Sequence, residues 1–264
     1  MTVVMSRALS RIAVIAACTL AAGLPVQPAA ARTLAEVQAL GAISMCAHPD
    51  ALPYASDKTD LPGFQVELGR KIAEGLGLSL SIDWIVPRRR ARVVNCDLLL
   101  DRPSEPRVVE GQVLLSHPYH LSGVALGLAK DAKPVTDYRE LEKGQKIGVM
   151  ISSVASVVLG KAGKTTSPYA FQSDMIEDLE KGALYGVAIS APSMSYYIHT
   201  HPGAGLRMAY AFDSVPELNW RVSLGLRNAD QALLDAVNAI VDRLLADGTI
   251  TEIYRRYGVE HRQP

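Results

Sequence analysis

Short apolar runs alternate along the chain with longer segments whose apolar residues recur at helical spacing. Apolar runs bounded by turn residues predict strands, and they lie at 42–47, 80–86, 96–100, 122–130, 146–151, 185–190 and 220–227. Apolar positions three and four residues apart predict helices, and they lie at 63–78, 153–161, 173–181, 193–201, 229–248 and 249–258. Strands that alternate with helices over short connections are typical of an α/β fold with a mostly parallel sheet covered on both faces.

These elements form two successive series. Two extended segments, at about 122–130 and 212–226, lie between the series. We interpret the pattern as two lobes that the chain crosses twice. Such an architecture leaves a cleft, and clefts of this kind are where small ligands bind.

The first thirty-one residues have the pattern of a secretory signal peptide. Arg7 and Arg11 give a basic start, an apolar core follows, and small residues precede a cleavage site after Ala31. We therefore expect an exported, periplasmic protein. A lipoprotein-type site ending at Cys18 is the alternative, and it would leave a lipid anchor; the short apolar run before this cysteine favours the first interpretation.

Charge and motifs exclude several classes of function. The chain carries 27 basic and 27 acidic residues, and this balance argues against nucleic acid or an anionic membrane as the main partner. The sequence has no nucleophile elbow, zinc-protease helix or dinucleotide fingerprint. Its six histidines have no carboxylate or thiol at ligand spacing. We expect a non-enzymatic protein with no catalytic residues, no metal and no cofactor.

Two cysteines remain after the leader, Cys46 and Cys96. An even pair in an exported protein more often forms a disulfide than a metal site.

Polar residues next to predicted strands are candidates for ligand contacts. Ser190 ends the apolar run "VAIS", and the carboxyl ends of strands are where open α/β folds meet their ligands. Ser152 and Ser153 precede a helix, where they can cap it, hold an anion, or do both. Arg88 and Arg89, in the run "PRRR", belong either to a solvated face or to a cleft or partner contact.

Four segments along the chain carry a resemblance to a known family. They are "GFQVELGRKIAEGLGL", the segment from "CDLLL" through "SHPYH" to "SGVALGLAK", "KIGVMISSVAS" and the C-terminal "LRNADQALLDAVNAIVDRLLADGTITEIYRRYG". Over most of its length the chain thereby resembles the extracellular solute-binding proteins of family 3. This resemblance implies a two-lobed type II periplasmic binding fold with two hinge strands. The implied divisions are a signal peptide at 1–31, a discontinuous first lobe at 32–126 and 213–264, and a second lobe at 127–212.

The resemblance also implies which residues form the binding site. Some of these residues differ from those usual in the family. Ser190 stands where amino acid binders carry an Asp that pairs with the ligand's ammonium, and a serine supplies no countercharge. Arg107 resembles the family's carboxylate-binding Arg, but it is two residues closer to Asp97 than usual. Tyr54 takes the position that lies over the ligand. With Ser152 and Ser153, these residues imply a small polar or anionic ligand in place of a zwitterionic amino acid.

A narrower resemblance rests on "MCAHPDALPYAS", "DWIVPRRR" and "NCDLLL", which contain both cysteines. These segments resemble proteins associated with PQQ-dependent alcohol and methanol dehydrogenases. The resemblance implies a disulfide between Cys46 and Cys96, whose strands lie side by side in this fold, and a quinoprotein dehydrogenase or its cytochrome c as partner. The alternatives are a receptor that docks on an ABC permease and, less favoured, a cyclohexadienyl dehydratase-like enzyme for which Asp50, Glu105 and His117 are the residues of suitable type.

Overall fold

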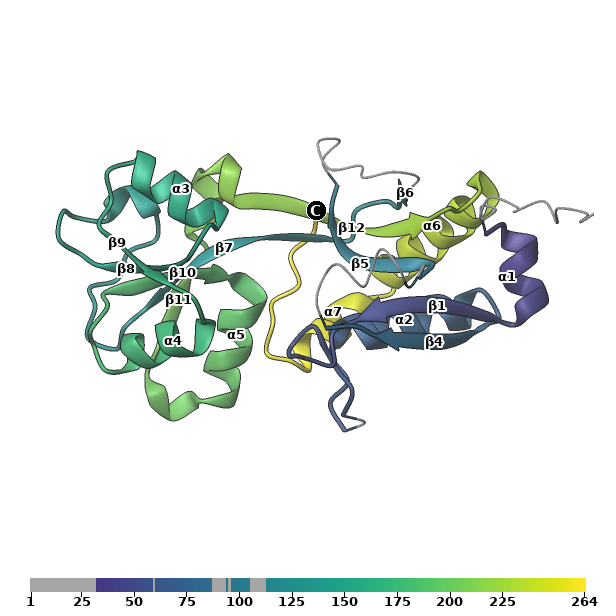
Figure 1. The fold of residues 1–264 in the computed structure, drawn as a ribbon, viewed down its shortest axis with the longest axis horizontal. Helices are drawn as coiled ribbons and strands as arrows, with labels where there is room; N and C mark the ends of the chain where they lie inside the picture. The colour runs from purple at the N-terminus through teal and green to yellow at the C-terminus, as the bar shows by residue number, and fades with distance from the viewer. Residues whose placement is uncertain (1–31, 59, 87–93, 95, 105–112) are drawn as a thin grey trace, which may run out of the picture. The chain divides into compact units, whose positions relative to one another are not determined.

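The computed structural model describes residues 32–58, 60–86, 94, 96–104 and 113–264 (Figure 1). The expected signal peptide at 1–31 lies outside these residues. No helix in the described ranges is long and apolar enough to cross a membrane.

The first lobe is built on a sheet whose strands come from both ends of the described chain. β1 (Ala42–Ala47) lies between β4 (Ser79–Trp84) and β5 (Leu98–Pro103) and is parallel to both. β12 (Asn219–Arg227) pairs antiparallel with β5, and β6 (Val113–Leu115) pairs with β12. The sheet therefore joins strands from the first hundred residues to one near residue 220.

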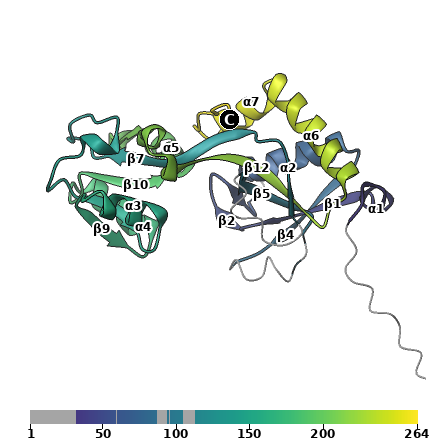
Figure 2. The ribbon, with the colours of Figure 1, turned by 90° about the horizontal axis from the view of Figure 1, so that it is seen from above.

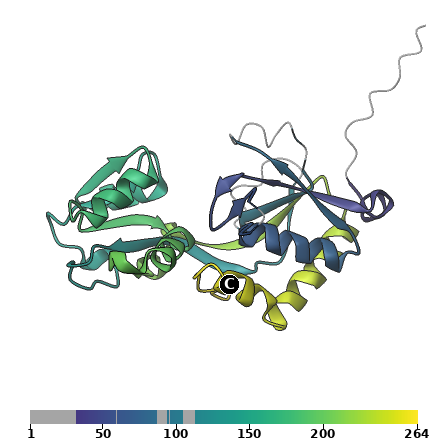
Figure 3. The ribbon, with the colours of Figure 1, turned by 90° about the horizontal axis from the view of Figure 1, so that it is seen from below.

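The helices of this lobe are α1 (Leu34–Leu40), α2 (Phe64–Gly75), α6 (Gln231–Ala246) and α7 (Thr249–Arg255). α2, α6 and α7 lie together beside the sheet (Figures 2 and 3). Their apolar faces share one buried core with the strands, which includes Val66, Ile72, Val237, Ile253 and Leu224. The amphipathic spacing predicted from the sequence is what fills this core.

The second lobe has its own sheet. β8 (Ile147–Met150) lies between β9 (Thr166–Tyr169) and β10 (Gly186–Ser190) and is parallel to both. β10 then pairs antiparallel with β7 (His120–Leu128), and β11 (Arg207–Ala209) pairs with β7 as well.

Three helices cover this sheet: α3 (Val154–Lys161), α4 (Gln172–Glu180) and α5 (Ala191–Thr200). Alternate residues of β10 enter different core clusters, because successive side chains of a strand point to opposite faces. Ala188 joins the cluster of α3, whereas Val187 and Ile189 join that of α4 and α5. The predicted sheet with helices on both faces is thus present here.

β7 is shared by the two lobes. Its first residues pair with β12, with Gly123 opposite Asn219, and its later residues pair with β10, with Val124 opposite Ser190. The second crossing is the stretch from β11 through short 3-10 turns, Ala211–Ser214 and Pro216–Leu218, into β12. The boundary residues given above for each lobe stay a prediction.

Some elements differ from the sequence prediction. The segment "DYRELEKG", for which the sequence predicts a short helix, holds only a 3-10 turn, Tyr138–Glu140. Helix α1 and strands β2 (Asp50–Ala51), β3 (Ala55–Ser56), β6, β9 and β11 were not predicted. The predicted helix at 63–78 is confirmed as α2, which ends before Gly77 in the left-handed conformation (φ 72°).

Candidate functional site

Ser190 lies at the end of β10, where the sequence places it, and is the N-cap of α5. Its Oγ accepts a hydrogen bond from the backbone N–H of Ser193 (3.4 Å) and donates one to the Ser193 Oγ (2.7 Å). The remaining contact is with the hydroxyl of Tyr54, 2.9 Å away. Since the single proton of Ser190 goes to Ser193, Tyr54 donates in this contact. The side chains of Tyr54 and Ser190 are therefore in direct contact, as is needed if both belong to one binding site.

Tyr54 is held by the tight turn between β2 and β3. Its backbone N–H donates to the Ala51 carbonyl (2.8 Å), and its own carbonyl accepts from Gln65 at the start of α2 (3.0 Å). Gly63 makes this approach possible, because a Cβ at that position would lie 2.3 Å from the Tyr54 carbonyl oxygen. The ring packs on Phe64, with centroids 5.0 Å apart. Backbone and ring contacts thus fix where the Tyr54 hydroxyl points.

Ser152 and Ser153 form the turn between β8 and α3. Ser152 is exposed and adopts a left-handed conformation (φ 60°). Ser153 is the N-cap of α3, and its side chain accepts from the backbone N–H of Ser156 (3.1 Å). The capping role expected for Ser153 is confirmed, and the anion role of the pair stays a prediction.

Asp101 was not recognised from the sequence. The structure connects it with Tyr54 through Gln65, whose backbone N–H donates to the Tyr54 carbonyl (3.0 Å) and whose side-chain amide donates to Asp101. It lies on β5 at a position where the pairing with β12 shifts register between Ser223 and Gly225. Its own backbone is left-handed (φ 55°), as at a β-bulge, which re-aims a side chain. A sequence signal for this residue did exist. In "LLLD" a carboxylate follows an apolar run, and a polar residue at the end of an apolar strand is also what drew attention to Ser190.

Tyr119 and Gln65 hold the Asp101 side chain. The hydroxyl of Tyr119 donates to Oδ1 (2.9 Å), and the Gln65 amide donates to Oδ2. The carboxyl is half-buried, and burial raises its pKa above the ordinary value, against the lowering effect of the two hydrogen bonds.

The charge of Asp101 affects the pKa of three tyrosines. Burial raises the pKa of Tyr54, Tyr119 and Tyr254, and the nearby Asp101 carboxylate raises it further because it disfavours a second negative charge. The Tyr254 hydroxyl is buried and has no hydrogen-bond partner in the described part of the chain, although the neighbouring Tyr119 hydroxyl lowers its pKa somewhat. Asp101 therefore lies within a cluster of phenol groups.

Three predicted site residues, Arg88, Arg89 and Arg107, lie outside the described residues, as does Glu105. His117 is exposed and pairs with Asp242 on α6, 3.0 Å away. Asp50 is also exposed, in β2. Within the described ranges no group of three or more His, Cys, Asp or Glu side chains is arranged to hold a metal ion.

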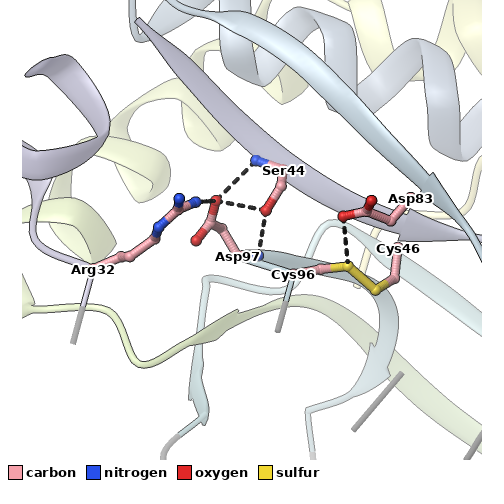
Figure 4. The surroundings of a disulfide bond; sticks show 6 residues. All are labelled: Arg32, Ser44, Cys46, Asp83, Cys96 and Asp97. Atoms are coloured by element: carbon pink, nitrogen blue, oxygen red, sulfur yellow. Dashed lines mark hydrogen bonds and ion pairs between the residues drawn. A yellow bond between two sulfur atoms is a disulfide. The ribbon is translucent and has the colours of Figure 1, made fainter. Parts of the chain in front are cut away.

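The predicted disulfide between Cys46 and Cys96 is confirmed, with the Cα atoms 5.6 Å apart (Figure 4). It ties the end of β1 to the residues that precede β5, beside the pair Met45 and Leu98. The next residue, Asp97, is buried, and its Oδ2 accepts from the backbone and side chain of Ser44 (2.8 and 2.7 Å). The same oxygen pairs with Arg32 at 2.6 Å. Covalent and ionic links thus hold the strand that carries Asp101.

Residues 43–260 match the model of the bacterial extracellular solute-binding proteins, family 3. The match covers most of the chain, and the chain belongs to this family. Its two-lobed α/β structure is the type II periplasmic binding fold of that family, as the resemblance implied. Proteins of this family are mostly binding proteins, and they are extracellular.

Individual relatives are distant. The chain is 26% identical to an L-arginine-binding protein of Pseudomonas aeruginosa over 226 residues, which are 78% of this chain and 84% of that protein. It is 22% identical over 245 residues to the membrane-bound lytic murein transglycosylase F of Pseudomonas putida; these are 85% of this chain but only 48% of that protein, so the chain spans about half its length. Among solved structures, MxaJ from Methlophaga aminisulfidivorans MPT superposes with a TM-score of 0.67 at 18% identity, over 83% of this chain and 100% of that one.

Proposed function

We propose that this solute-binding protein is a periplasmic accessory of a PQQ-dependent alcohol or methanol dehydrogenase, and not an enzyme. The observation that carries the proposal is the disulfide between Cys46 and Cys96. It joins the two motifs, "MCAHPDALPYAS" and "NCDLLL", that resemble the dehydrogenase-associated branch. Ser190 also supports the proposal, because it stands at the strand end where amino acid binders carry an Asp. The structural likeness to MxaJ extends to the fold alone.

A protein partner needs a surface to dock on, and the second lobe offers an apolar one. Ile151, Val154, Val157 and Phe171 expose 57, 56, 51 and 66% of their surface. Ile151, Val154 and Val157 lie around the turn of Ser152 and Ser153. Phe171 is close to Ile151, because the Ile151 N–H donates to the carbonyl of Tyr169 (2.9 Å), two residues before Phe171. Grouped exposed apolar residues are typical of protein interaction sites.

The test is a deletion strain complemented with variants. We expect deletion to lower PQQ-dependent alcohol dehydrogenase activity in the periplasm, and the tagged wild-type protein to co-purify with the quinoprotein or its cytochrome c. The double variant V154S/V157S should lose this co-purification. The matched control L40S, at an equally exposed leucine of α1 in the other lobe (59%), should retain it. Unchanged dehydrogenase activity in the deletion strain would contradict the proposal.

The second candidate is the receptor of an ABC transporter for a small polar solute. It is favoured by the hydrogen bond between Tyr54 and Ser190, which keeps polar groups of both lobes in contact, and by the arginine-binding relative. An adjacent permease and ATPase gene pair, with uptake of a radiolabelled solute lost on deletion, would support this alternative.

A further inference from the structure

The second lobe has a hollow of about 880 Å³ at one end of its sheet. Residues 129–133 after β7, 143–146 before β8 and 179–185 before β10 line it, together with Ala204. Because β8 and β10 are parallel, their amino ends lie at the same edge of the sheet. Ser190 lies at the carboxyl end of β10. The hollow is therefore separate from the site of Tyr54 and Ser190.

Tyr185 fixes the three segments around the hollow relative to one another. Its backbone N–H donates to the Lys146 carbonyl (3.0 Å), and its own carbonyl accepts from the Ala129 N–H (3.2 Å). Its hydroxyl donates to the carbonyl of Lys133 (2.8 Å). The hollow is thus framed by a backbone that hydrogen bonds hold in place, although its side chains come from loops.

Lysine side chains dominate the charge of this hollow. Five exposed lysines line it, against two acidic residues, Asp131 and Glu180; the lysines are Lys130, Lys133, Lys143, Lys146 and Lys181. Seven of the nine lysines of the chain lie within 130–181, although basic and acidic residues are balanced at 27 each. The positive charge is therefore a local concentration and does not follow from the composition of the chain.

Most of this charge is not neutralised within the protein. Lys181 pairs with Glu177, but in the part of the chain that the structure describes the ammonium groups of the other four lysines make no hydrogen bond or ion pair. Elsewhere exposed cations do pair, as Lys71 does with Glu74 (2.8 Å) and Arg262 with Asp213 (2.7 Å). Like charges held around one hollow repel one another, and an anionic partner relieves this repulsion.

The chemistry of the lining favours a broad acidic surface over one small anion. No arginine is among the described lining residues, although Arg207 donates to the carbonyl of Ala132 from beside the hollow. Arginine recognises a single carboxylate or phosphate with two parallel hydrogen bonds, whereas lysine acts as a point charge on a flexible stem. The buried lining residues are apolar, namely Ala129, Leu179 and Leu184, so no buried polar side chain is present there to orient a small ligand.

We propose that this lysine hollow is a docking surface for the acidic face of a partner protein. Exposed complementary charges accelerate the encounter of two proteins and make their association sensitive to salt. A partner bound at the amino ends of β8 and β10 leaves the site of Tyr54 and Ser190, at the other end of β10, accessible. The proposal goes beyond the function proposed above and does not require the partner to be a dehydrogenase.

The experiment measures binding of a fluorescein-labelled peptide of alternating glutamate and alanine by fluorescence anisotropy. A peptide with glutamine in place of glutamate is the neutral counterpart. We expect the purified wild type to bind the glutamate peptide and not the glutamine peptide, with an affinity that falls at least about 10-fold between about 25 and about 150 mM NaCl. The variant K130Q/K133Q/K143Q/K146Q should bind the glutamate peptide at least about 30-fold more weakly at the lower salt concentration, because four weak charge contacts are lost together.

A charge-matched control separates the hollow from the net charge of the protein. K58Q/R70Q/K161Q/R221Q removes the same number of positive charges at exposed positions outside the hollow, and it should bind within about threefold of the wild type. K130R/K133R/K143R/K146R keeps the charge of the hollow and should also bind as the wild type does. Urea unfolding of each variant shows that a loss of binding is not a loss of folding.

Four results would overturn the proposal. They are no binding of the glutamate peptide by the wild type, an equal loss of affinity in the control variant, displacement of the peptide by inositol hexakisphosphate at a lower concentration than by unlabelled peptide, and lysine-dependent binding to vesicles of anionic phospholipid that exceeds binding to the peptide. The second result would mean that only net charge matters, the third that the hollow takes a small polyanion, and the fourth that it takes a membrane surface. V154S/V157S should bind the peptide unchanged, so failure of this proposal and failure of the dehydrogenase proposal are measured separately.

Discussion

The hydroxyl oxygens of Tyr54 and Ser190 lie 2.9 Å apart although the residues are separated by 136 positions in the sequence. This hydrogen bond joins the turn before α2 to the N-cap of α5. A neutral hydrogen bond contributes about 0.5–1.5 kcal/mol net. In a double-mutant cycle of Y54F and S190A, we therefore expect a coupling energy of about 0.5–1.5 kcal/mol in the free energy of unfolding by urea. A cycle of Y54F with T200A, on the far end of α5, is the control, and equal coupling in both cycles would refute a specific bond.

The sequence predicted most elements because their signals are local. The periodicity of α2 and α6 and the end of β10 at Ser190 are confirmed. Helix α1 was missed because it has only seven residues, yet its capping box, Thr33 with Glu36, is visible in the sequence. β9 was missed because it contains Pro168, which an edge strand tolerates.

The surroundings of Asp101 could not be predicted from the residues next to it in the sequence. Its side-chain direction depends on a register shift against β12, which is formed by residues more than a hundred positions later. Two of the phenol groups near it come from Tyr119, the residue before β7, and from Tyr254 on α7. No pattern within a few residues of Asp101 indicates these partners. The disulfide, in contrast, followed from the family resemblance and from the parity of the cysteines.

His120 makes the protein sensitive to acid. It is only 4% exposed, and its Nδ1 accepts from the Arg262 N–H (3.3 Å), so the ring is neutral. Burial, with a smaller effect of His261, lowers its pKa from 6.5 to about 3. Between these values the unfolded chain binds a proton that the folded protein does not, so stability falls as pH falls below about 6.5.

The expected loss from His120 at pH 5 is about 2 kcal/mol relative to pH 7, at about 1.4 kcal/mol per pH unit. The variant H120Q should lose this part of the pH dependence, measured by urea unfolding at several pH values. H117Q, at an exposed histidine, is the control. A wild-type profile that matches H120Q would contradict the assignment.

The disulfide contributes to stability through the unfolded chain. Cys46 and Cys96 are 50 positions apart, and closing a loop of that length is worth about 4 kcal/mol in the chain-entropy model. We expect the variant C46A/C96A, or the reduced wild type, to lose about 2–4 kcal/mol in free energy of unfolding. Two free thiols per molecule in the non-reduced protein, detected by mass spectrometry, would show that the bond is not formed in solution.

The ion pair of Arg32 and Asp97 gives a fourth prediction. Asp97 is 3% exposed, whereas Arg32 is 35% exposed. Removing the arginine leaves a buried charge whose described hydrogen bonds come from Ser44 and the neutral backbone. Because the arginine is partly solvated, we expect R32A to cost about 1–3 kcal/mol, less than the loss of a fully buried partner. R70A, at an exposed arginine of α2, should cost less than about 0.5 kcal/mol; an equal loss in both variants would mean that the pair is not stabilising.

Asp101 should give the opposite pH dependence from His120. Its pKa is raised from 3.8, first by burial. Between the unfolded and the folded pKa, the folded protein binds the additional proton, so stability falls as pH rises through this window. In D101N the side chain does not titrate. The free energy of unfolding of D101N minus that of the wild type should therefore increase from pH 4 towards neutrality and then become constant. The increase is measured by urea unfolding without ligand. A difference that shrinks as pH rises would mean that the carboxylate is stabilised in the folded protein, and would assign Asp101 a structural role.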